Sequence, residues 1–186
     1  MSDLLEKYIK EVSPVLQERF GYKNKMALPK IEKVVVNTGF GRMISGKGSE
    51  EQKKIIQNIF HDLSLICGQK PKLTTAKKSI SGFKIRKGMP LGAVVTLRGK
   101  RMYDFIERLI HVALPRSRDF KGISQKAFDK TGNLTIGIKE QTIFPEIMPE
   151  QTRLSFGFEV IINLRTKNKE EGIELLKLLG FPIKQK

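Results

Sequence analysis

Residues 153–165 read RLSFGFEVIINLR and alternate between apolar and polar side chains. Along an extended strand, successive side chains point to opposite faces, so an alternating run has one apolar and one polar face. The apolar face of this run would carry Phe156, Phe158, Val160, Ile162 and Leu164. Strands of parallel sheets are buried on both faces and do not alternate in this way. The stretch therefore predicts an antiparallel sheet that is covered on one side.

Segments on either side of this stretch complete the expected fold. Further strands are predicted over residues 31–37, 91–98 and 133–139, and helices over 4–20, 49–67, 100–114 and 168–180. We expect Pro14 to kink or restart the first helix, with Ser13 as its new cap, because proline lacks a backbone N–H. Ser49 and Gln52 have the spacing of a capping box. The prediction is one α+β domain over residues 1–186, with a mostly antiparallel sheet and helices packed on one face.

The composition points to a polyanionic partner. The 186 residues include 35 lysines and arginines against 19 acidic residues, which gives a net charge of +16. Such an excess is typical of proteins that bind nucleic acid or an anionic membrane surface. The single Cys67 cannot form a disulfide within the chain, which favours a reducing compartment. Because the apolar runs are short and the N-terminal segment is acidic and amphipathic, we expect a cytoplasmic protein.

The positive charge is concentrated in the middle of the chain. Residues 63–103 contain no aspartate or glutamate, but they contain Lys70, Lys72, Lys77, Lys78, Lys84, Arg86, Lys87, Arg98, Lys100 and Arg101. We expect a long, exposed basic loop over about residues 70–90, which are rich in serine, threonine and glycine. This composition disfavours an amphipathic membrane helix, and no helix typical of duplex-DNA readers is evident, so RNA is the preferred partner. Phe83 either stacks on a base or packs into the core.

A second class of function rests on residues 39–49, which read GFGRMISGKGS. The segment differs from a phosphate-binding loop at Gly48, where a serine or threonine would bind Mg²⁺. No Walker B strand is present, and such loops belong to parallel sheets. A nucleotide-binding enzyme built on residues 41–48 is therefore the less favoured alternative. No catalytic constellation is evident, and the two histidines and Cys67 lack metal-site spacing, so we expect no cofactor.

An acidic loop is expected over about residues 139–152, which read KEQTIFPEIMPEQT. Three glutamates, Glu140, Glu146 and Glu150, surround several apolar residues that include Phe144 and Ile147. These apolar side chains either fold back into the core or act as anchors for a basic protein partner.

Several motifs resemble the bacterial ribosomal protein L5 family. They are VVVNTGFG, CGQKPKLTTAKKSISGFKIRKGMPLGAVVTLRGKRMYDFIERLI, LPRSRDFKGIS, GNLTIGIKEQTIFPEI and KNKEEGIELLKLLGFP, and they extend over essentially the whole chain. The resemblance implies a large-subunit protein that binds 5S ribosomal RNA (rRNA) in the central protuberance, together with large-subunit rRNA and neighbouring 5S-associated proteins. It also implies contact with P-site transfer RNA (tRNA) through the basic loop and a bridge to the small-subunit head protein S13.

The resemblance also assigns individual residues. Family positions that face 5S rRNA correspond to Asn37, Thr38, Gly39, Gln69 and Thr96, to which we add the cations Lys70 and Arg98. The tRNA loop corresponds to Lys77, Lys78, Ser79, Gly82 and Phe83, together with Lys84. The subunit bridge corresponds to Glu140, Phe144, Glu146, Ile147 and Glu150. Uncharged polar side chains suit the first set, because they can hydrogen-bond base edges and 2′-hydroxyls once cations have positioned the RNA backbone.

Overall fold

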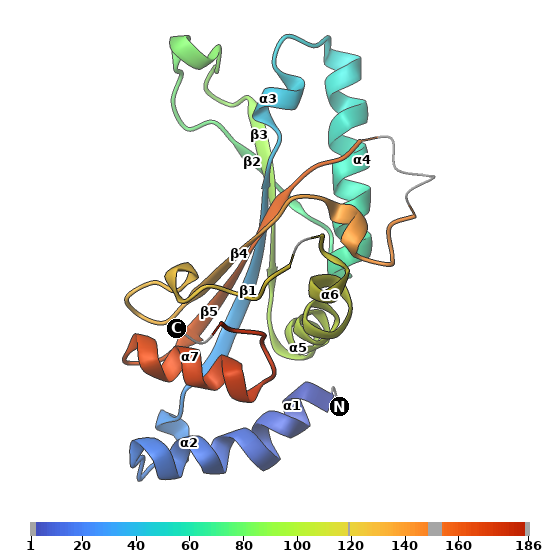
Figure 1. Cartoon of the computed structure of the whole chain (residues 1–186). Helices are drawn as coiled ribbons and strands as arrows, with labels where there is room; N and C mark the ends of the chain where they lie inside the picture. Colours follow the sequence, from blue (N-terminus) through green and yellow to red (C-terminus); the bar gives the residue numbers. More distant parts are fainter. Residues whose placement is uncertain (1–2, 119, 149–153, 185–186) are drawn as a thin grey trace. The chain divides into compact units, whose positions relative to one another are not determined.

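The computed structural model describes residues 3–118, 120–148 and 154–184, which divide into two compact units (Figure 1). Unit 1 comprises Met1–Val34, Leu97–Ile136 and Ile161–Lys186, and unit 2 comprises Val35–Thr96 and Gly137–Val160. The expectation of a single domain stays a prediction.

Five strands form an antiparallel sheet among the described residues, in the order β2-β3-β1-β5-β4. The strands are β1 (Lys30–Gly39), β2 (Lys72–Thr75), β3 (Pro90–Leu97), β4 (Leu134–Ile138) and β5 (Phe158–Arg165). Burial alternates along β4 and along β5, as expected for strands that are covered on one face. The predicted α+β class with a mostly antiparallel sheet is therefore confirmed, although β5 begins five residues later than the alternating sequence suggested.

The N-terminal helix of unit 1 is continuous, so the predicted cap at Ser13 is wrong. It runs through α1 (Asp3–Lys7), a π-helical turn over Tyr8–Val12 and α2 (Ser13–Phe20). Ser13 has helical dihedral angles and donates its backbone N–H to the Tyr8 carbonyl. The ring of Pro14 and its missing N–H are incompatible with regular α-helical bonding. The wider π turn that precedes Pro14 accommodates the proline, so the helix continues.

The second long helix of unit 1 repeats this arrangement. It consists of α5 (Gly99–Arg108), a π-helical turn over Leu109–Ala113 and α6 (Leu114–Arg116), so that Pro115 lies within the last turn. α1 packs against α5 in this unit. The remaining helix, α7 (Lys169–Leu178), carries a buried Glu171, whose carboxylate accepts hydrogen bonds from the Tyr22 hydroxyl and the Lys167 backbone N–H.

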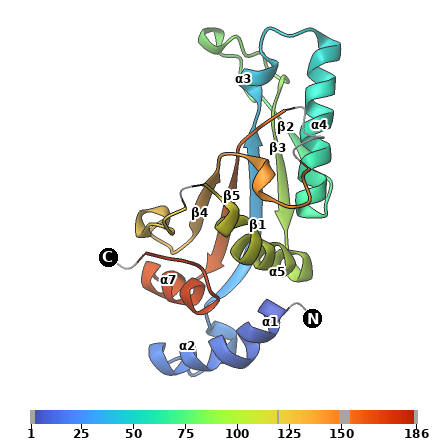
Figure 2. The ribbon, with the colours of Figure 1, turned by 45° about the vertical axis from the view of Figure 1, so that its right-hand side comes forward.

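Unit 2 is organised around the long helix α4 (Ser49–Cys67), which runs alongside β2 and β3 in both views (Figures 1 and 2). Its buried stripe is Ile55, Ile59, Leu63, Ile66 and Cys67. The predicted left-handed cap at Gly68 is confirmed by φ of 63°. The predicted capping box is wrong, because Gly48 is the N-cap and the Gln52 side chain instead donates to the carbonyls of Ile44 and Lys47.

Two further features of unit 2 were not predicted. The short helix α3 (Gly41–Ile44) lies within the glycine-containing segment of residues 39–49, and β2 occupies the start of the expected basic loop. β2 pairs with β3, with Leu73 opposite Ala93, and the register shifts between Thr74 and Thr75. At Gly92 in β3, a Cβ would lie 2.5 Å from the Thr38 carbonyl oxygen, so only glycine allows the strands to approach this closely.

Candidate nucleic-acid interface

The segment that joins β2 to β3 is a hairpin loop over residues 76–89, here called the basic loop, and it belongs to unit 2. At its base, the Ala76 backbone pairs with Gly88 and Met89. Further out, Ile80 and Ile85 exchange two backbone hydrogen bonds of 2.9 and 3.1 Å, and the Ser79 hydroxyl accepts the Lys87 backbone N–H. These bonds satisfy backbone groups that would otherwise depend on water and give the loop a defined conformation.

The tip of the basic loop presents an exposed aromatic ring. A 3₁₀ turn over Ser81–Phe83 is followed by Lys84, which has a left-handed conformation with φ of 54°. Such a conformation is uncommon for a residue with a Cβ and persists where neighbouring bonds enforce it. Phe83 is 71% exposed. Of the two alternatives for Phe83, burial in the core is therefore wrong, and the ring is available to a partner.

Positive charge surrounds this ring. The basic loop carries Lys77, Lys78, Lys84, Arg86 and Lys87, and all five are exposed. Within the part of the chain that the structure describes, none of them forms an ion pair. Since residues 63–103 contain no acid, no neighbour along this stretch offsets their charge. An exposed, unneutralised group of cations is the arrangement that attracts an RNA backbone.

The residues assigned to 5S rRNA differ in their accessibility. Asn37 is half-buried and Gly39 is exposed, but Thr38 between them is only 2% exposed. The Thr38 hydroxyl donates a 2.7 Å hydrogen bond to the Gly157 carbonyl within unit 2. The assignment of the Thr38 side chain to RNA contact is therefore wrong, because the alternation of β1 turns it inward.

Gln69 and Thr96 are brought together in unit 2. The Gln69 side-chain amide, just after the end of α4, donates to the Thr96 backbone carbonyl at 3.3 Å, near the end of β3. Both residues are half-buried, and Lys70 beside them is exposed. Arg98 is exposed as well, but it belongs to unit 1, where it is the N-cap of α5. An accessible polar pair next to a cation can read RNA through hydrogen bonds.

The acidic segment is pinned to unit 2 by a buried glutamine that the sequence did not single out. Gln141 is fully buried; its amide nitrogen donates to the Leu154 carbonyl at 2.6 Å, and its amide oxygen accepts the Phe156 backbone N–H at 2.9 Å. Phe144 is also fully buried, with its ring centroid 6.0 Å from that of Phe158, and Ile147 is 4% exposed.

Of the two alternatives for the apolar residues of this segment, folding back into the core is confirmed for Phe144 and Ile147. Their assignment as exposed anchors of the bridge is wrong. The exposed residues among the described part of this segment are Lys139, Glu140, Pro145 and Met148, and Glu146 is half-buried. Glu150 lies outside the described residues.

The structure also argues against a phosphate-binding loop at residues 41–48. Residues 41–44 are helical, and Lys47, which lies just before α4, forms an ion pair of 2.6 Å with Glu51 of that helix. A phosphate-binding loop needs a free lysine and an open run of backbone N–H groups, and this segment offers neither. Among the described residues, no group of acidic, histidine and cysteine side chains is arranged to hold a metal ion. None of the helices in residues 3–118, 120–148 and 154–184 is long and apolar enough to cross a membrane.

Comparison with known proteins identifies the family to which the chain belongs. The family model described as ribosomal protein L5 matches residues 24–86, and that of the ribosomal L5P family C-terminus matches residues 90–183. Two relatives named large ribosomal subunit protein uL5, from Thermoanaerobacter sp. (strain X514) and Caldanaerobacter subterraneus subsp. tengcongensis, are each 53% identical over 182 residues. These alignments cover 98% of this chain and 98% of each relative. The chain therefore belongs to the ribosomal protein L5 family.

Proposed function

We propose that this protein is a constituent of the large ribosomal subunit that binds 5S rRNA and attaches it in the central protuberance. The observation that carries the proposal is the acid-free stretch of residues 63–103, whose ten lysines and arginines are all exposed, in a member of the L5 family. A structural role in the ribosome requires this kind of surface and no catalytic group. The proposal places the protein in the cytoplasm, within the ribosome.

The 5S rRNA surface in unit 2 consists of Asn37, Gly39, Gln69, Lys70 and Thr96. Asn37 and the Gln69–Thr96 pair present neutral polar groups, and Lys70 supplies charge. Cations hold an RNA backbone without regard to sequence, whereas amide and hydroxyl groups discriminate base edges and ribose hydroxyls. Gly39 has open space where a Cβ would lie, so RNA can approach the backbone there. Arg98 supports RNA binding from unit 1.

A second RNA contact is proposed for the basic loop, which would meet P-site tRNA through Lys77, Lys78, Ser79, Gly82 and Lys84, with Phe83 at its tip. All six are exposed, and the loop has its own internal hydrogen bonds. A preformed loop loses less conformational entropy when it binds a partner that must enter and leave repeatedly.

A protein contact is proposed for the acidic segment, which would form a bridge to the small-subunit protein S13 through Glu140, Glu146 and Glu150. The buried Gln141, Phe144 and Ile147 support this surface from within rather than touching the partner. Glutamates complement a basic partner, and surface charges are screened by salt, which suits a contact that must change as the subunits move.

Hydroxyl-radical footprinting of 5S rRNA with the full chain tests the main proposal. We expect protection of one discrete region of 5S rRNA, and the Asn37→Ala variant should lose part of that protection. Lys53→Ala, which removes an exposed cation of α4 outside the proposed surface, serves as the matched control and should leave the footprint unchanged. Protection spread evenly along the RNA, or no protection, would contradict 5S rRNA binding.

A further inference from the structure

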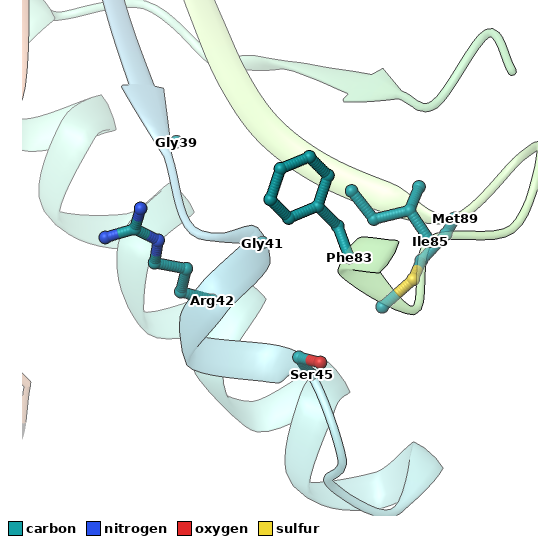
Figure 3. A pocket seen from close by; sticks show the side chains of 7 residues that line it. All are labelled: Gly39, Gly41, Arg42, Ser45, Phe83, Ile85 and Met89. Carbon is teal, nitrogen blue, oxygen red and sulfur yellow. The ribbon is translucent and has the colours of Figure 1, made fainter. Parts of the chain in front are cut away.

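Unit 2 contains a hollow of about 490 Å³ between residues 39–45, which include the end of β1 and α3, and the basic loop (Figure 3). Gly39, Gly41, Arg42 and Ser45 line it from the first segment, and Phe83, Ile85 and Met89 line it from the loop. Figure 3 shows the Phe83 ring facing the turn at Gly41, with Ile85 and Met89 beside it, while the Arg42 side chain extends in the direction of Gly39.

We propose that this hollow binds one unstacked nucleotide of an RNA partner, with its base against Phe83 and its phosphate held by Arg42. The inference rests on the proposed function, because it assumes that the protein binds RNA. The inference adds a site for a single extruded base. It also gives roles to Arg42, Ile85 and Met89, to which the resemblance to the L5 family assigned none.

The walls of the hollow match the parts of a nucleotide. Phe83 offers an exposed π-face, and Ile85 and Met89 extend the apolar wall on which a base can stack. The volume lies within the range of sites that hold small organic groups. Arg42 is exposed and has five N–H donors for phosphate oxygens, and Ser45 adds a hydroxyl that can both donate and accept.

The electrostatic setting favours a nucleotide of a polymer over an apolar peptide or a free nucleotide. Lys84 and Arg86 flank the ring along the basic loop, and no acidic residue lines the hollow. A free nucleotide would need a cradle for its phosphates, but Lys47 is paired with Glu51. A polymer does not need that cradle, because its neighbouring phosphates would meet the surrounding cations.

The ring is held in place before any ligand arrives. The Phe83 backbone N–H bonds to the Ile80 carbonyl at 3.3 Å, Lys84 bonds to Ser81 at 3.0 Å, and the Ile80–Ile85 pair closes the turn. An exposed phenylalanine side chain is unfavourable in water. Here the hydrogen bonds of the turn hold Phe83 at the edge of the hollow and keep its ring out of the core. Such preorganisation lowers the entropy lost on binding.

The test uses the full chain with 5S rRNA and, in a second arm, large subunits carrying each variant with P-site tRNA. Phe83→Leu keeps apolar volume but removes the π-face, and Phe83→Tyr keeps the ring. Gly39→Ala places a methyl group in open space at the hollow. Its matched control is Gly137→Ala, another exposed strand glycine of unit 2 with open space around a Cβ but outside the hollow. Arg42→Gln is compared with Lys53→Gln.

We expect Phe83→Leu, Gly39→Ala and Arg42→Gln each to lower the affinity for the same one of the two RNAs about tenfold. This is the scale of losing one stacked base or one well-placed charge. Phe83→Tyr, Gly137→Ala and Lys53→Gln should bind as the unchanged protein does. Ultraviolet crosslinking should join Phe83 to a single base of the same RNA, which identifies the source of the nucleotide. All of these variants should have unchanged melting temperatures, since the altered side chains are exposed.

Two results would overturn the inference, and they differ in what they say about the proposed function. If 5S rRNA binds with a discrete footprint but Phe83→Leu and Gly39→Ala bind both RNAs normally, the hollow holds no nucleotide and the proposed function stands. If the unchanged protein fails to bind 5S rRNA, the proposed function fails and this inference fails with it.

Discussion

The Thr38 hydroxyl donates a hydrogen bond of 2.7 Å to the Gly157 carbonyl, and this bond separates two adjacent residues of β1 into different roles. Thr38 is buried and serves the fold, whereas the side chain of Asn37 is half-buried and has no hydrogen-bond partner among the described residues. Of these two residues, only Asn37 is therefore positioned to meet RNA at the proposed 5S rRNA surface.

Substitution of these two neighbours should have opposite consequences. Asn37→Ala should weaken 5S rRNA binding by about 1–3 kcal/mol if a hydrogen bond buried in the complex is lost, with no change in the free energy of unfolding. Thr38→Val keeps the side-chain shape but leaves the Gly157 carbonyl without its donor, so it should lower the free energy of unfolding by about 1–2 kcal/mol. Filter-binding titrations and urea unfolding measure the two quantities. Weaker RNA binding by a fully folded Thr38→Val would contradict this division.

The basic loop should act on tRNA and not on 5S rRNA. Replacement of both Lys77 and Lys78 by alanine removes two exposed charges, so it should increase the rate of P-site tRNA dissociation from large subunits and leave 5S rRNA affinity nearly intact. Replacement of Lys53 and Lys54 by alanine is the matched control, because these are also adjacent exposed lysines of unit 2. Equal loss of 5S rRNA binding in the loop variant and in Asn37→Ala would contradict the separation of the tRNA surface from the 5S rRNA surface.

The acidic segment should show separate effects of its exposed and buried residues. Glu140→Lys reverses an exposed charge, so it should lower the fraction of joined ribosomal subunits at low magnesium without changing stability. Phe144→Ala removes a fully buried ring, so it should destabilise the protein by about 3–5 kcal/mol. Magnesium titrations of subunit joining and thermal melts measure these effects. Normal joining by Glu140→Lys would remove Glu140 from the proposed bridge.

The raised pKa values of two tyrosines predict how the free energy of unfolding depends on pH in the alkaline range. Burial raises the pKa of Tyr103 to about 12, with a smaller contribution from Tyr8, and burial together with the Glu171 hydrogen bond raises the pKa of Tyr22 to about 12. An unfolded tyrosine ionises near its ordinary pKa of 10.0, so the stabilising contribution is fully present below pH 10. It is lost as pH rises from about 10 to about 12, because only the unfolded chain then releases these protons.

Urea unfolding at several alkaline pH values tests this dependence. Tyr103→Phe keeps the buried ring and removes the ionising hydroxyl, so its stability should fall less steeply with pH than that of the unchanged protein. Because the two proteins differ only at residue 103, the difference between the two curves isolates Tyr103. Identical slopes would show that Tyr103 ionises normally in the folded state.

Much of the fold was predictable because its main elements have simple periodicities. The alternation along residues 156–164 and the stripe of α4 each describe one apolar face, and such faces appear directly in the sequence. β2 could not be found in this way, because Lys72–Thr75 has a single apolar residue and owes its structure to pairing with β3. The π turns before Pro14 and Pro115 were missed for a related reason, since tertiary packing outweighs the local preference of proline to end a helix.

The interface was predictable in its charge but not in its accessibility. The acid-free stretch of residues 63–103 indicated an RNA surface, and the basic loop within it is exposed. Sequence reasoning could not show that Phe83 faces outward while Phe144 faces inward, because both lie in segments rich in polar residues. The two hydrogen bonds of Gln141 to residues 154–156 depend on segments that meet only in the folded chain. The same holds for the hollow between Arg42 and Phe83.

The most direct test of the account is the salt dependence of 5S rRNA binding by the full chain. Each phosphate contact made by a lysine or arginine releases condensed counterions, so the logarithm of the binding constant falls linearly with the logarithm of salt concentration. Five exposed cations of residues 63–103 lie outside the basic loop, namely Lys70, Lys72, Arg98, Lys100 and Arg101. If each contacts one phosphate, we expect a slope of about −4 between about 50 and about 200 mM salt. A slope between zero and about −1 would contradict the claim that this surface binds the RNA backbone.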